Sequence, residues 1–361
     1  MIKLLIINPG STSTKIAVYE DQKEKWTENI RHSAGELQKY KNVYDQLDMR
    51  IQLIRETLRG HKEELDSFGA IVSRGGNLPP VSAGAYEVTD FMVECLRERP
   101  RDQHASNVGA GIALALAKEI GVKAYIYDAV AVDEMDEINK ITGLKGVRRP
   151  ARGHTLNTRA AALKYCEDNN LDYKRVNLIV VHLGGGISVN LHSKGRIIDF
   201  ISDCEGPICP ERAGGLPSYE VVKLCYSGQY TYAEMMRSLQ RKGGMMSYFD
   251  TADMQEIEAW YNGGREDVKL IYEAMTLSVA KNIAKLAPVV QGNVDCVILT
   301  GGIAYSRLFT EQVTERIRFL APVAIIPGEN EMQALANGIL RVMSGQETAK
   351  ILTPEDDMRD R

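Results

Sequence analysis

The sequence predicts an α/β protein built from two similar domains, and three observations support this fold class. LLIINPGSTSTKIAVYE (4–20) places a Gly and a run of hydroxyl residues between two strand-like segments. VNLIVVHLGGGISVNLHSKGRIIDF (176–200) repeats the order of strand, Gly-rich turn and alternating strand. VDCVILTGGIAYSRLF (294–309) then gives a strand, two glycines and a helix. A duplicated unit of this kind predicts two domains that face each other across a cleft.

The first half of the chain is predicted to alternate between strands and helices. Residues 2–8 and 15–20 are expected to pair as a hairpin around Gly10. A charged amphipathic helix is predicted over 39–60, and a buried strand over 68–76 ends in an Arg and two glycines.

The later elements follow from the same kinds of signal. SNVGAGIALALAKEIG (106–121) has a polar start, a small apolar body and a terminal Gly, which is typical of a buried helix. A strand is predicted over 122–128 and a long helix over 266–288. VAIIPGENEMQALANGILRVMSG gives a strand, a loop and a capped helix. The polar tail from Gln346 is predicted to be frayed.

Length, charge and cysteine usage exclude several classes of protein. The 361 residues suffice for two domains with buried cores, and the net charge of -4 gives no reason to expect nucleic acid or an anionic membrane as partner. No apolar run reaches membrane-spanning length, and no signal-peptide pattern opens the chain. The six cysteines form no C-x-x-C pair, which argues against a zinc site or a disulfide framework. We therefore expect reduced thiols in a cytoplasmic protein.

The first Gly-hydroxyl run is not a P-loop. A P-loop needs a second Gly directly before the Lys, a Ser or Thr directly after it, and a following helix. Here Thr14 precedes Lys15, Ile16 follows it, and the next residues alternate as a strand does. The sequence therefore predicts that the Gly-hydroxyl run lies at the turn of a strand hairpin.

Two such hairpins and a strand–TGG–helix element resemble the actin-like ATPase and sugar-kinase superfamily. Within it, the chain is similar to the acetate and butyrate kinase family. NPGSTSTK looks like the family's opening motif, HLGGG like its second phosphate motif and LTGGIAYS like its adenosine motif. The resemblance runs from Ile2 to about Gly345. The chain length and PERAGGLP (210–217) favour the butyrate kinase branch.

This resemblance implies two actin-like (ribonuclease H-like) domains, each with a mixed sheet flanked by helices, and an ATP cleft between them. We expect an N-terminal domain over 1–130 plus 332–361 and a nucleotide-binding domain over 131–331. The resemblance also implies ATP/ADP and Mg²⁺ as ligands and a homodimer or higher homo-oligomer as the assembly.

The resemblance assigns phosphate and nucleotide binding to glycine-rich turns. Gly lets a backbone approach a phosphate closely, and hydroxyls and amides donate hydrogen bonds to it. The alternatives are an ordinary polar turn and, for His182, a core histidine at a strand end. Acetate kinases carry Asn at the position of Gly185, so here the backbone amides are expected to carry more of the phosphate binding. The candidates are Gly10, Ser11, Ser13, His182, Gly184, Gly185, Gly186, Gly301, Gly302 and Ile303.

Catalytic roles are implied for four polar residues. Arg74 and Arg212 match the family's two catalytic arginines, whose planar guanidinium groups suit carboxylate and phosphoryl oxygens. A transferring phosphoryl spreads charge over three oxygens, so positive donors are needed there. His154 matches the active-site histidine, with a surface histidine as the alternative, and Asn8 is expected to point at the phosphoryl.

Two carboxylates are expected to associate with magnesium. Asp128 ends a strand, where ligands bind in such sheets, and a carboxylate substrate is already ionised and needs no base. The resemblance therefore makes Asp128 a positioning or magnesium-shell group. Glu331 matches the other magnesium-associated carboxylate, or is a first-turn helix acid after Asn330. Magnesium takes only one or two protein carboxylates. His104 and Asn107 match a cleft-floor motif and are expected to be structural.

Gly75 and Gly76 stand where acetate kinases carry two valines, the second of which walls the methyl pocket. The missing side chains are expected to open a substrate pocket for a longer or branched acyl tail. Alternatively, the glycines serve the backbone turn and another side chain closes the space.

The predicted reaction is butanoate + ATP = butanoyl phosphate + ADP, by reversible, direct in-line phosphoryl transfer. Related carboxylate kinases, for isobutyrate and other branched acids, propionate or acetate, remain alternatives. A sugar or alcohol kinase would need a base, for which Asp128 is the candidate, and paired arginines suit a carboxylate better. A polyphosphate or guanosine-pentaphosphate phosphatase would not be expected to carry the PER loop. An actin- or chaperone-like ATPase predicts polymerisation or a peptide-binding domain, and no such module is visible after residue 345.

Overall fold

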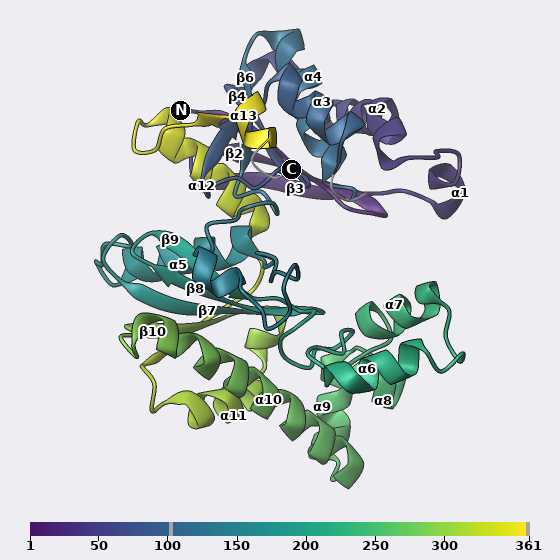
Figure 1. Cartoon of the computed structure of the whole chain (residues 1–361). Coiled ribbons are helices and arrows are strands. Elements are labelled where there is room, and N and C mark those ends of the chain that lie inside the picture. The colour runs from purple at the N-terminus through teal and green to yellow at the C-terminus, as the bar shows by residue number, and fades with distance from the viewer. Residues whose placement is uncertain (101–103, 359–361) are drawn as a thin grey trace. The chain divides into compact units, whose positions relative to one another are not determined.

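Two mixed sheets organise the chain, one in each of two units (Figure 1). The computed structural model describes residues 1–100 and 104–358. Unit 1 comprises Met1–Asp133 and Asn330–Arg361, and unit 2 comprises Glu134–Glu329.

The unit 1 sheet begins with the predicted hairpin. Three antiparallel strands in succession, β1, β2 and β3, form one part of the sheet, whose order is β12-β5-β6-β4-β1-β2-β3. On the other side of β1, β4 pairs parallel with β1 and β6 pairs parallel with β4, whereas β5 runs antiparallel to β6. At the first turn, the Gly10 amide donates to Ser13 O over 2.7 Å. The strands are β1 (Lys3–Pro9), β2 (Ser13–Glu20), β3 (Lys23–Arg31), β4 (Ala70–Arg74), β5 (Ala85–Glu87), β6 (Lys123–Tyr127) and β12 (Lys350–Ile351).

Helices pack on both faces of this sheet. Successive strand residues point to opposite faces, so Leu5 and Ile7 join one core with the α4 residue Ile112. α12 also packs on β1, β4 and β6, and its Leu335 is fully buried. The helices are α1 (Ala34–Leu37), α2 (Leu47–Gly60), α3 (Asp90–Glu98), α4 (Asn107–Ile120), α12 (Glu331–Met343) and α13 (Pro354–Met358).

The prediction of a helix over 39–60 is wrong at its start, since α2 begins only at Leu47. Val43–Gln46 forms a separate 3₁₀ turn. The Asn42 amide donates to Asp45 Oδ2 over 3.0 Å, which closes this tighter turn before the α-helix begins.

The unit 2 sheet repeats the topology, which confirms the internal repeat. Again three antiparallel strands are followed by two that run parallel with the first, in the order β11-β10-β7-β8-β9. The strands are β7 (Asn177–Leu183), β8 (Ile187–Ser193), β9 (Arg196–Ile201), β10 (Cys296–Gly301) and β11 (Val323–Pro327).

Each face of the second sheet has its own helices. Val181 and Leu299 belong to the core that includes residues of α10 and α11, whereas Val180 and Ile298 join the core formed with α5. The helices are α5 (Thr155–Asp168), α6 (Ser218–Cys225), α7 (Tyr232–Gln240), α8 (Met245–Phe249), α9 (Met254–Asn262), α10 (Glu266–Leu286) and α11 (Arg307–Ile317).

Residues 346–358 of the tail include β12 and α13, so the prediction that the tail frays from Gln346 is wrong for these residues. β12 pairs with β5, and Leu352 is 2% exposed. Lys350 Nζ donates to Ala83 O over 2.6 Å, which ties the tail to the sheet despite its polar composition. Within residues 1–100 and 104–358, no helix has the length and apolarity required to cross a membrane.

Candidate active site

In unit 1, three predicted site residues meet at the carboxyl ends of two strands. Asn8, near the end of β1, donates from Nδ2 to Glu331 Oε2 over 2.6 Å. Arg74, the last residue of β4, lies 3.3 Å from Glu331 Oε1 through its NH1. Its Nε is buried without a hydrogen-bond partner, so Arg74 keeps a donor unused. Glu331 opens α12 directly after Asn330, which is the helix-end position that the sequence allowed.

A buried arginine that the sequence analysis missed supports the first hairpin. Arg50 is fully buried on α2 and donates to Gly10 O over 3.0 Å, Ser13 O over 3.1 Å and Thr14 Oγ1 over 2.8 Å. Burial lowers the pKa of its guanidinium to about 10. Arg50 therefore fixes the backbone of the hairpin and leaves Ser11 exposed at its tip.

Asp128 is 3% exposed and has a left-handed backbone, with φ of 42°. Its Oδ1 accepts from the Gly84 amide over 2.7 Å, and its own amide donates to Gly84 O over 3.1 Å. Strained backbone of this kind persists only where surrounding contacts hold it. This pair of bonds gives Asp128 a structural function at the end of β6.

The space expected beside Gly75 and Gly76 is filled at both positions. A Cβ at Gly75 would lie 2.5 Å from Ala129 Cβ, and a Cβ at Gly76 would lie 2.7 Å from Asn107 Oδ1. The expectation that the missing side chains open a pocket is therefore wrong, because neighbouring residues occupy that volume. Asn107 also accepts from the Asn77 amide over 2.9 Å, which agrees with a structural role.

In unit 2, the Gly184–Gly186 turn lies against two carboxylates. A Cβ at Gly186 would come within 2.7 Å of Asp203 Oδ2, and a Cβ at Gly185 would contact Glu211 at 3.5 Å. Arg212 pairs with both acids, through Nε to Asp203 at 3.3 Å and through NH1 to Glu211 at 3.2 Å. The structure therefore brings Arg212 to the second hairpin. Sequence reasoning missed Asp203 and Glu211, although Glu211 belongs to the PER motif.

Two predicted histidines stack on each other. The His154 and His182 rings lie 3.9 Å apart between centroids and are nearly parallel. Asn157 Nδ2 donates to His182 Nδ1 over 2.7 Å, which directs the opposite ring nitrogen, Nε2, toward Glu329 Oε1 at 3.2 Å. Ser188 Oγ lies 2.9 Å from His154 Nδ1. His182 is 4% exposed, and both of its ring nitrogens have polar partners.

The TGG turn after β10 depends on glycine for two reasons. Gly301 has φ of 92°, and a Cβ there would collide with Leu183 O. Its amide donates to Gly328 O over 3.2 Å, and the Gly328 amide donates back to Gly301 O over 3.0 Å. Gly302 has open space at its Cβ position, and Ile303 is 9% exposed. The backbone at Gly302 is therefore accessible to a ligand, because no heavy atom lies within 4 Å of its Cβ position.

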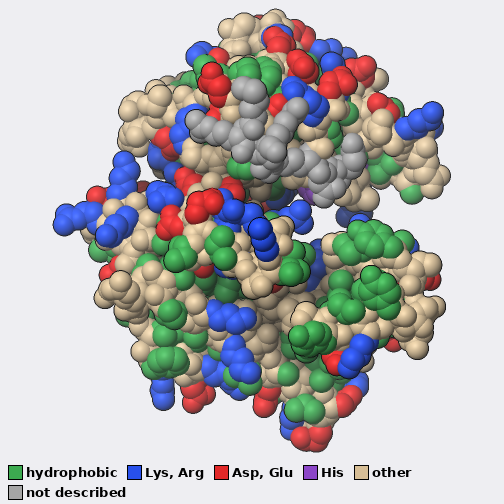
Figure 2. Space-filling model, in the orientation of Figure 1, with side chains coloured by type: hydrophobic (Ala, Val, Ile, Leu, Met, Phe, Trp, Pro, Cys, Tyr) green, Lys and Arg blue, Asp and Glu red, His purple; other side chains and the backbone are tan. Residues whose placement is uncertain are grey.

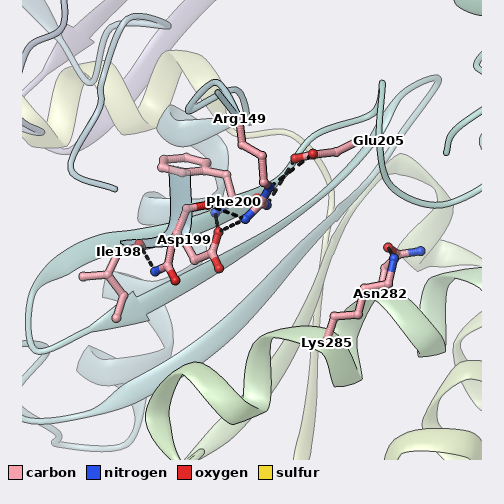
Figure 3. Close-up of polar contacts among 8 residues, drawn as sticks. Arg149, Ile198, Asp199, Phe200, Glu205, Asn282 and Lys285 are labelled. Carbon is pink, nitrogen blue, oxygen red and sulfur yellow. Dashed lines mark hydrogen bonds and ion pairs between the residues drawn. The ribbon is translucent and has the colours of Figure 1, made fainter. Parts of the chain in front are cut away.

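Arg149 anchors the loop that leads to His154 (Figure 3). Its guanidinium bonds to Asp199 Oδ1 at 3.0 Å, to Glu205 at 3.2 Å and to the carbonyl of Phe200. NH1 also donates to Asn139 O over 2.9 Å, within the same loop. The stretch 148–154 is basic and contains Pro150, and the acidic partners of Arg149 are about 50 positions away along the chain.

Of the two carboxylates that were expected to bind magnesium in unit 1, only Glu331 is accessible enough to do so. Among the described residues, no group of three or more His, Cys, Asp or Glu side chains is placed to hold a metal. Magnesium, however, usually takes one or two protein carboxylates and completes its shell with water and phosphate oxygens. The Glu331 carboxylate is 23% exposed and suits that use. Asp128 is buried, and one of its oxygens is already bonded.

Residues 139–357 match the sequence pattern of the Acetokinase family. Butyrate kinase 1 of Clostridium acetobutylicum is 46% identical over 352 residues, which are 97% of this chain and 99% of that protein. Probable butyrate kinase 2 of Caldanaerobacter subterraneus subsp. tengcongensis is 44% identical over 352 residues, again 97% and 99% of the two chains.

Among solved structures, an acetate kinase from Porphyromonas gingivalis is similar with a TM-score of 0.79 and 18% identity. The similarity covers 95% of this chain and 100% of that one. A propionate kinase from Francisella tularensis has a TM-score of 0.74 at 16% identity, covering 94% and 99%. The predicted fold class, with mixed sheets flanked by helices, is thereby confirmed.

Proposed function

The chain belongs to the acetokinase family, and on this premise we propose that it transfers the γ-phosphoryl of ATP to butanoate, giving butanoyl phosphate and ADP, and catalyses the reverse reaction. It is a phosphotransferase with a carboxyl group as acceptor. We propose butanoate as the substrate because the chain is 46% identical, over 97% of its length, to a protein named butyrate kinase.

Unit 1 supplies groups for the acid and the moving phosphoryl. We assign Arg74 to these oxygens because its Nε has no partner and its NH1 is held by Glu331 at 3.3 Å. A guanidinium fixed in this way is oriented before substrate binds, which lowers the entropic cost of orientation. The Asn8 amide, held by the same carboxylate, is assigned to the phosphoryl.

Glycine-rich turns supply groups for phosphate oxygens. The amides of Gly184, Gly185 and Gly186 are assigned to them in unit 2, and the Gly10–Ser13 turn is assigned to them in unit 1. Arg212 and His154 are assigned to the charge that develops in the transition state. The nucleotide is assigned to Gly301, Gly302 and Ile303, where the backbone stands open at Gly302. These assignments need no covalent intermediate, because positioning and charge stabilisation suffice for in-line transfer.

The magnesium proposal centres on Glu331. A bound magnesium ion would neutralise phosphate charge, and Glu331, with Asp128 as the second candidate carboxylate, would hold it. Glu331→Ala should therefore raise the magnesium concentration that gives half-maximal activity. A magnesium titration of Glu331→Ala and Glu331→Gln measures this midpoint. If the midpoint stays at the wild-type value in both variants, Glu331 acts only on Asn8, Arg74 and the helix end.

A screen of acids tests the proposed reaction. The protein is incubated with ATP and one acid at a time, and hydroxylamine traps the acyl phosphate as a hydroxamate. Butanoate is expected to give the highest kcat/KM among acetate, propionate, butanoate and isobutyrate. A pocket that buries two more methylenes than acetate fills gains about 1.6 kcal/mol, roughly tenfold in kcat/KM. Acetate at or above butanoate would contradict the substrate, and ATP consumption without hydroxamate would contradict the acyl transfer.

We further propose a cytoplasmic location and a homo-oligomeric assembly. All six cysteines are free thiols, which suits a reducing compartment. Unit 1 would act as the N-terminal domain and unit 2 as the nucleotide-binding domain.

A further inference from the structure

Ser188 is buried at a place where its hydroxyl meets His154 twice. It lies on β8 and is fully buried. Its Oγ accepts a hydrogen bond from the backbone amide of His154 over 3.2 Å and lies 2.9 Å from Nδ1 of the His154 ring. In the part of the chain that the structure describes, the Ser188 hydroxyl bonds to His154 alone.

These two contacts determine which ring nitrogen of His154 carries the proton. A serine hydroxyl donates one proton and accepts through two lone pairs. Because the His154 amide already donates to Oγ, the hydroxyl proton needs an acceptor, and a bare Nδ1 supplies it. If Nδ1 carried the proton, Oγ would accept two N–H groups and its own proton would be buried without an acceptor, which is costly. A neutral ring with a bare Nδ1 carries its proton on Nε2.

The His154 ring and backbone are held in place by other contacts as well. The ring stacks on that of His182, with 3.9 Å between centroids. The His154 carbonyl accepts from the Thr158 amide over 2.9 Å at the start of α5. Directly before His154, a Cβ at Gly153 would lie 2.6 Å from Asn190 Oδ1, so the chain packs closely against β8 there. The backbone, the ring plane and the ring proton are therefore all oriented before a ligand binds.

The neighbouring histidine has its proton fixed in the same way. Asn157 Nδ2 donates to His182 Nδ1 over 2.7 Å, which leaves Nε2 as the protonated nitrogen of a neutral ring. On the face of the molecule in Figure 2, hardly any side chain of a described histidine is visible, whereas charged side chains are widespread. For an enclosed histidine, the hydrogen bond to one ring nitrogen sets the protonation of the other.

We propose that Ser188 is a positioning residue, which fixes His154 as the tautomer whose Nε2–H donates to the phosphoryl group during transfer. This rests on the proposed function, in which His154 stabilises charge in the transition state. A donor that is already oriented needs no reorganisation at the moment of reaction. The other tautomer would present a lone pair on Nε2 to the phosphoryl oxygens, which also carry lone pairs, and so could not donate to them.

Steady-state kinetics of Ser188→Ala tests this role. We expect kcat for hydroxamate formation from butanoate to fall about 10–100-fold, the size typical of losing a residue that orients a functional histidine. The KM for ATP should stay near the wild-type value, because His154 is assigned to the transition state.

Ser193→Ala is the matched control. It removes a hydroxyl from the same strand, where Ser193 Oγ donates to Asn177 Oδ1 over 2.7 Å, and it should keep the wild-type kcat. A wild-type kcat in Ser188→Ala, or an equal loss in Ser193→Ala, would overturn the proposal.

A double-mutant cycle shows whether Ser188 acts through His154. His154→Ala should lower kcat by itself, and adding Ser188→Ala should then cause little further loss, since the ring that Ser188 orients is gone. If the two losses multiply instead, Ser188 supports the fold independently of His154 and the proposal is wrong.

Nitrogen NMR of the full chain, labelled with ¹⁵N-histidine, tests the tautomer without reference to activity. The chain has six histidines, and the spectrum of His154→Ala identifies the resonances of His154. In slightly alkaline buffer, where an ordinary imidazole is neutral, the wild type is expected to show a bare Nδ1 and a protonated Nε2. Ser188→Ala should show a mixture of both tautomers.

The wild-type spectrum needs no variant at Ser188, so it decides even if Ser188→Ala does not fold. A protonated Nδ1 at His154 in the wild type, or an unchanged spectrum in folded Ser188→Ala, would overturn the proposal. Hydroxamate formation by the wild type shows separately whether the proposed reaction holds.

Discussion

At the scale of single residues, Arg212 is held in place by acids rather than left in solvent. Its ion pairs with Asp203 and Glu211 position it beside the Gly184–Gly186 turn. Arg212→Ala should lower kcat strongly with a small effect on the KM for ATP, since an arginine that stabilises a phosphoryl transition state is worth on the order of thousands-fold. Arg307→Ala, which removes an 88% exposed arginine from unit 2, is the control for steady-state kinetics. A variant that keeps more than about a tenth of wild-type kcat, a loss under ~1.4 kcal/mol, would remove Arg212 from this function.

Glycine placement is the second residue-scale question. Gly76 has Asn107 and Leu96 within 3 Å of where a Cβ would lie, whereas Gly60 has nothing within 4 Å. Gly76→Ala should therefore destabilise the fold by about 1–3 kcal/mol through overpacking. Gly60→Ala, at the end of α2, should be neutral or slightly stabilising. Urea denaturation of both variants measures the difference. Equal stability would restore the interpretation that open volume lies beside Gly76.

At the scale of elements, Glu63 joins the end of α2 to two strands of the sheet. Burial raises the pKa of its carboxyl, but hydrogen bonds from Lys3, Trp26 and Lys25 outweigh burial and hold that pKa at about 2, below the ordinary 4.5. Because the pKa falls on folding, the stabilisation is fully present above pH 4.5 and is lost as pH drops toward 2.

Glu63→Gln should accordingly lower the free energy of unfolding by about 2 kcal/mol at pH 7. The difference from wild type should shrink between pH 4.5 and 2. Urea denaturation at a series of pH values follows this, with the exposed neighbour Glu64→Gln as control. If the Glu63→Gln and wild-type profiles run parallel through this range, the network does not stabilise the ionised form.

At the scale of the whole molecule, unit 1 is assembled from both ends of the chain. The last strand, β12, pairs with β5 and places Leu352 in the same core as Leu5 and Ile7. Leu352→Ala should cost about 2–5 kcal/mol, whereas Ile351→Ala, at 56% exposure, should cost little. Thermal unfolding monitored by circular dichroism compares the two. Matching melting temperatures would mean that the tail is dispensable for unit 1.

The sequence by itself determined the two hairpins, their repetition and most strands, because these depend on local alternation and on glycine at turns. Motifs that are contiguous in the chain also identified the arginines, histidines and carboxylates that are the site candidates. The family followed from the same motifs. Such local signals can be recognised in the sequence without knowledge of the tertiary structure.

Only the tertiary structure decided how the site residues are held. Arg50 reaches the Gly10 turn from 40 positions away, and Asn8 meets Glu331 across 323. No local pattern marks such partners, because burial and long-range packing select them. The same reason explains why the predictions at Gly76 and in the tail were wrong. Asn107 and Leu96 fill the volume beside Gly76, and β5 orders a segment that is polar by composition.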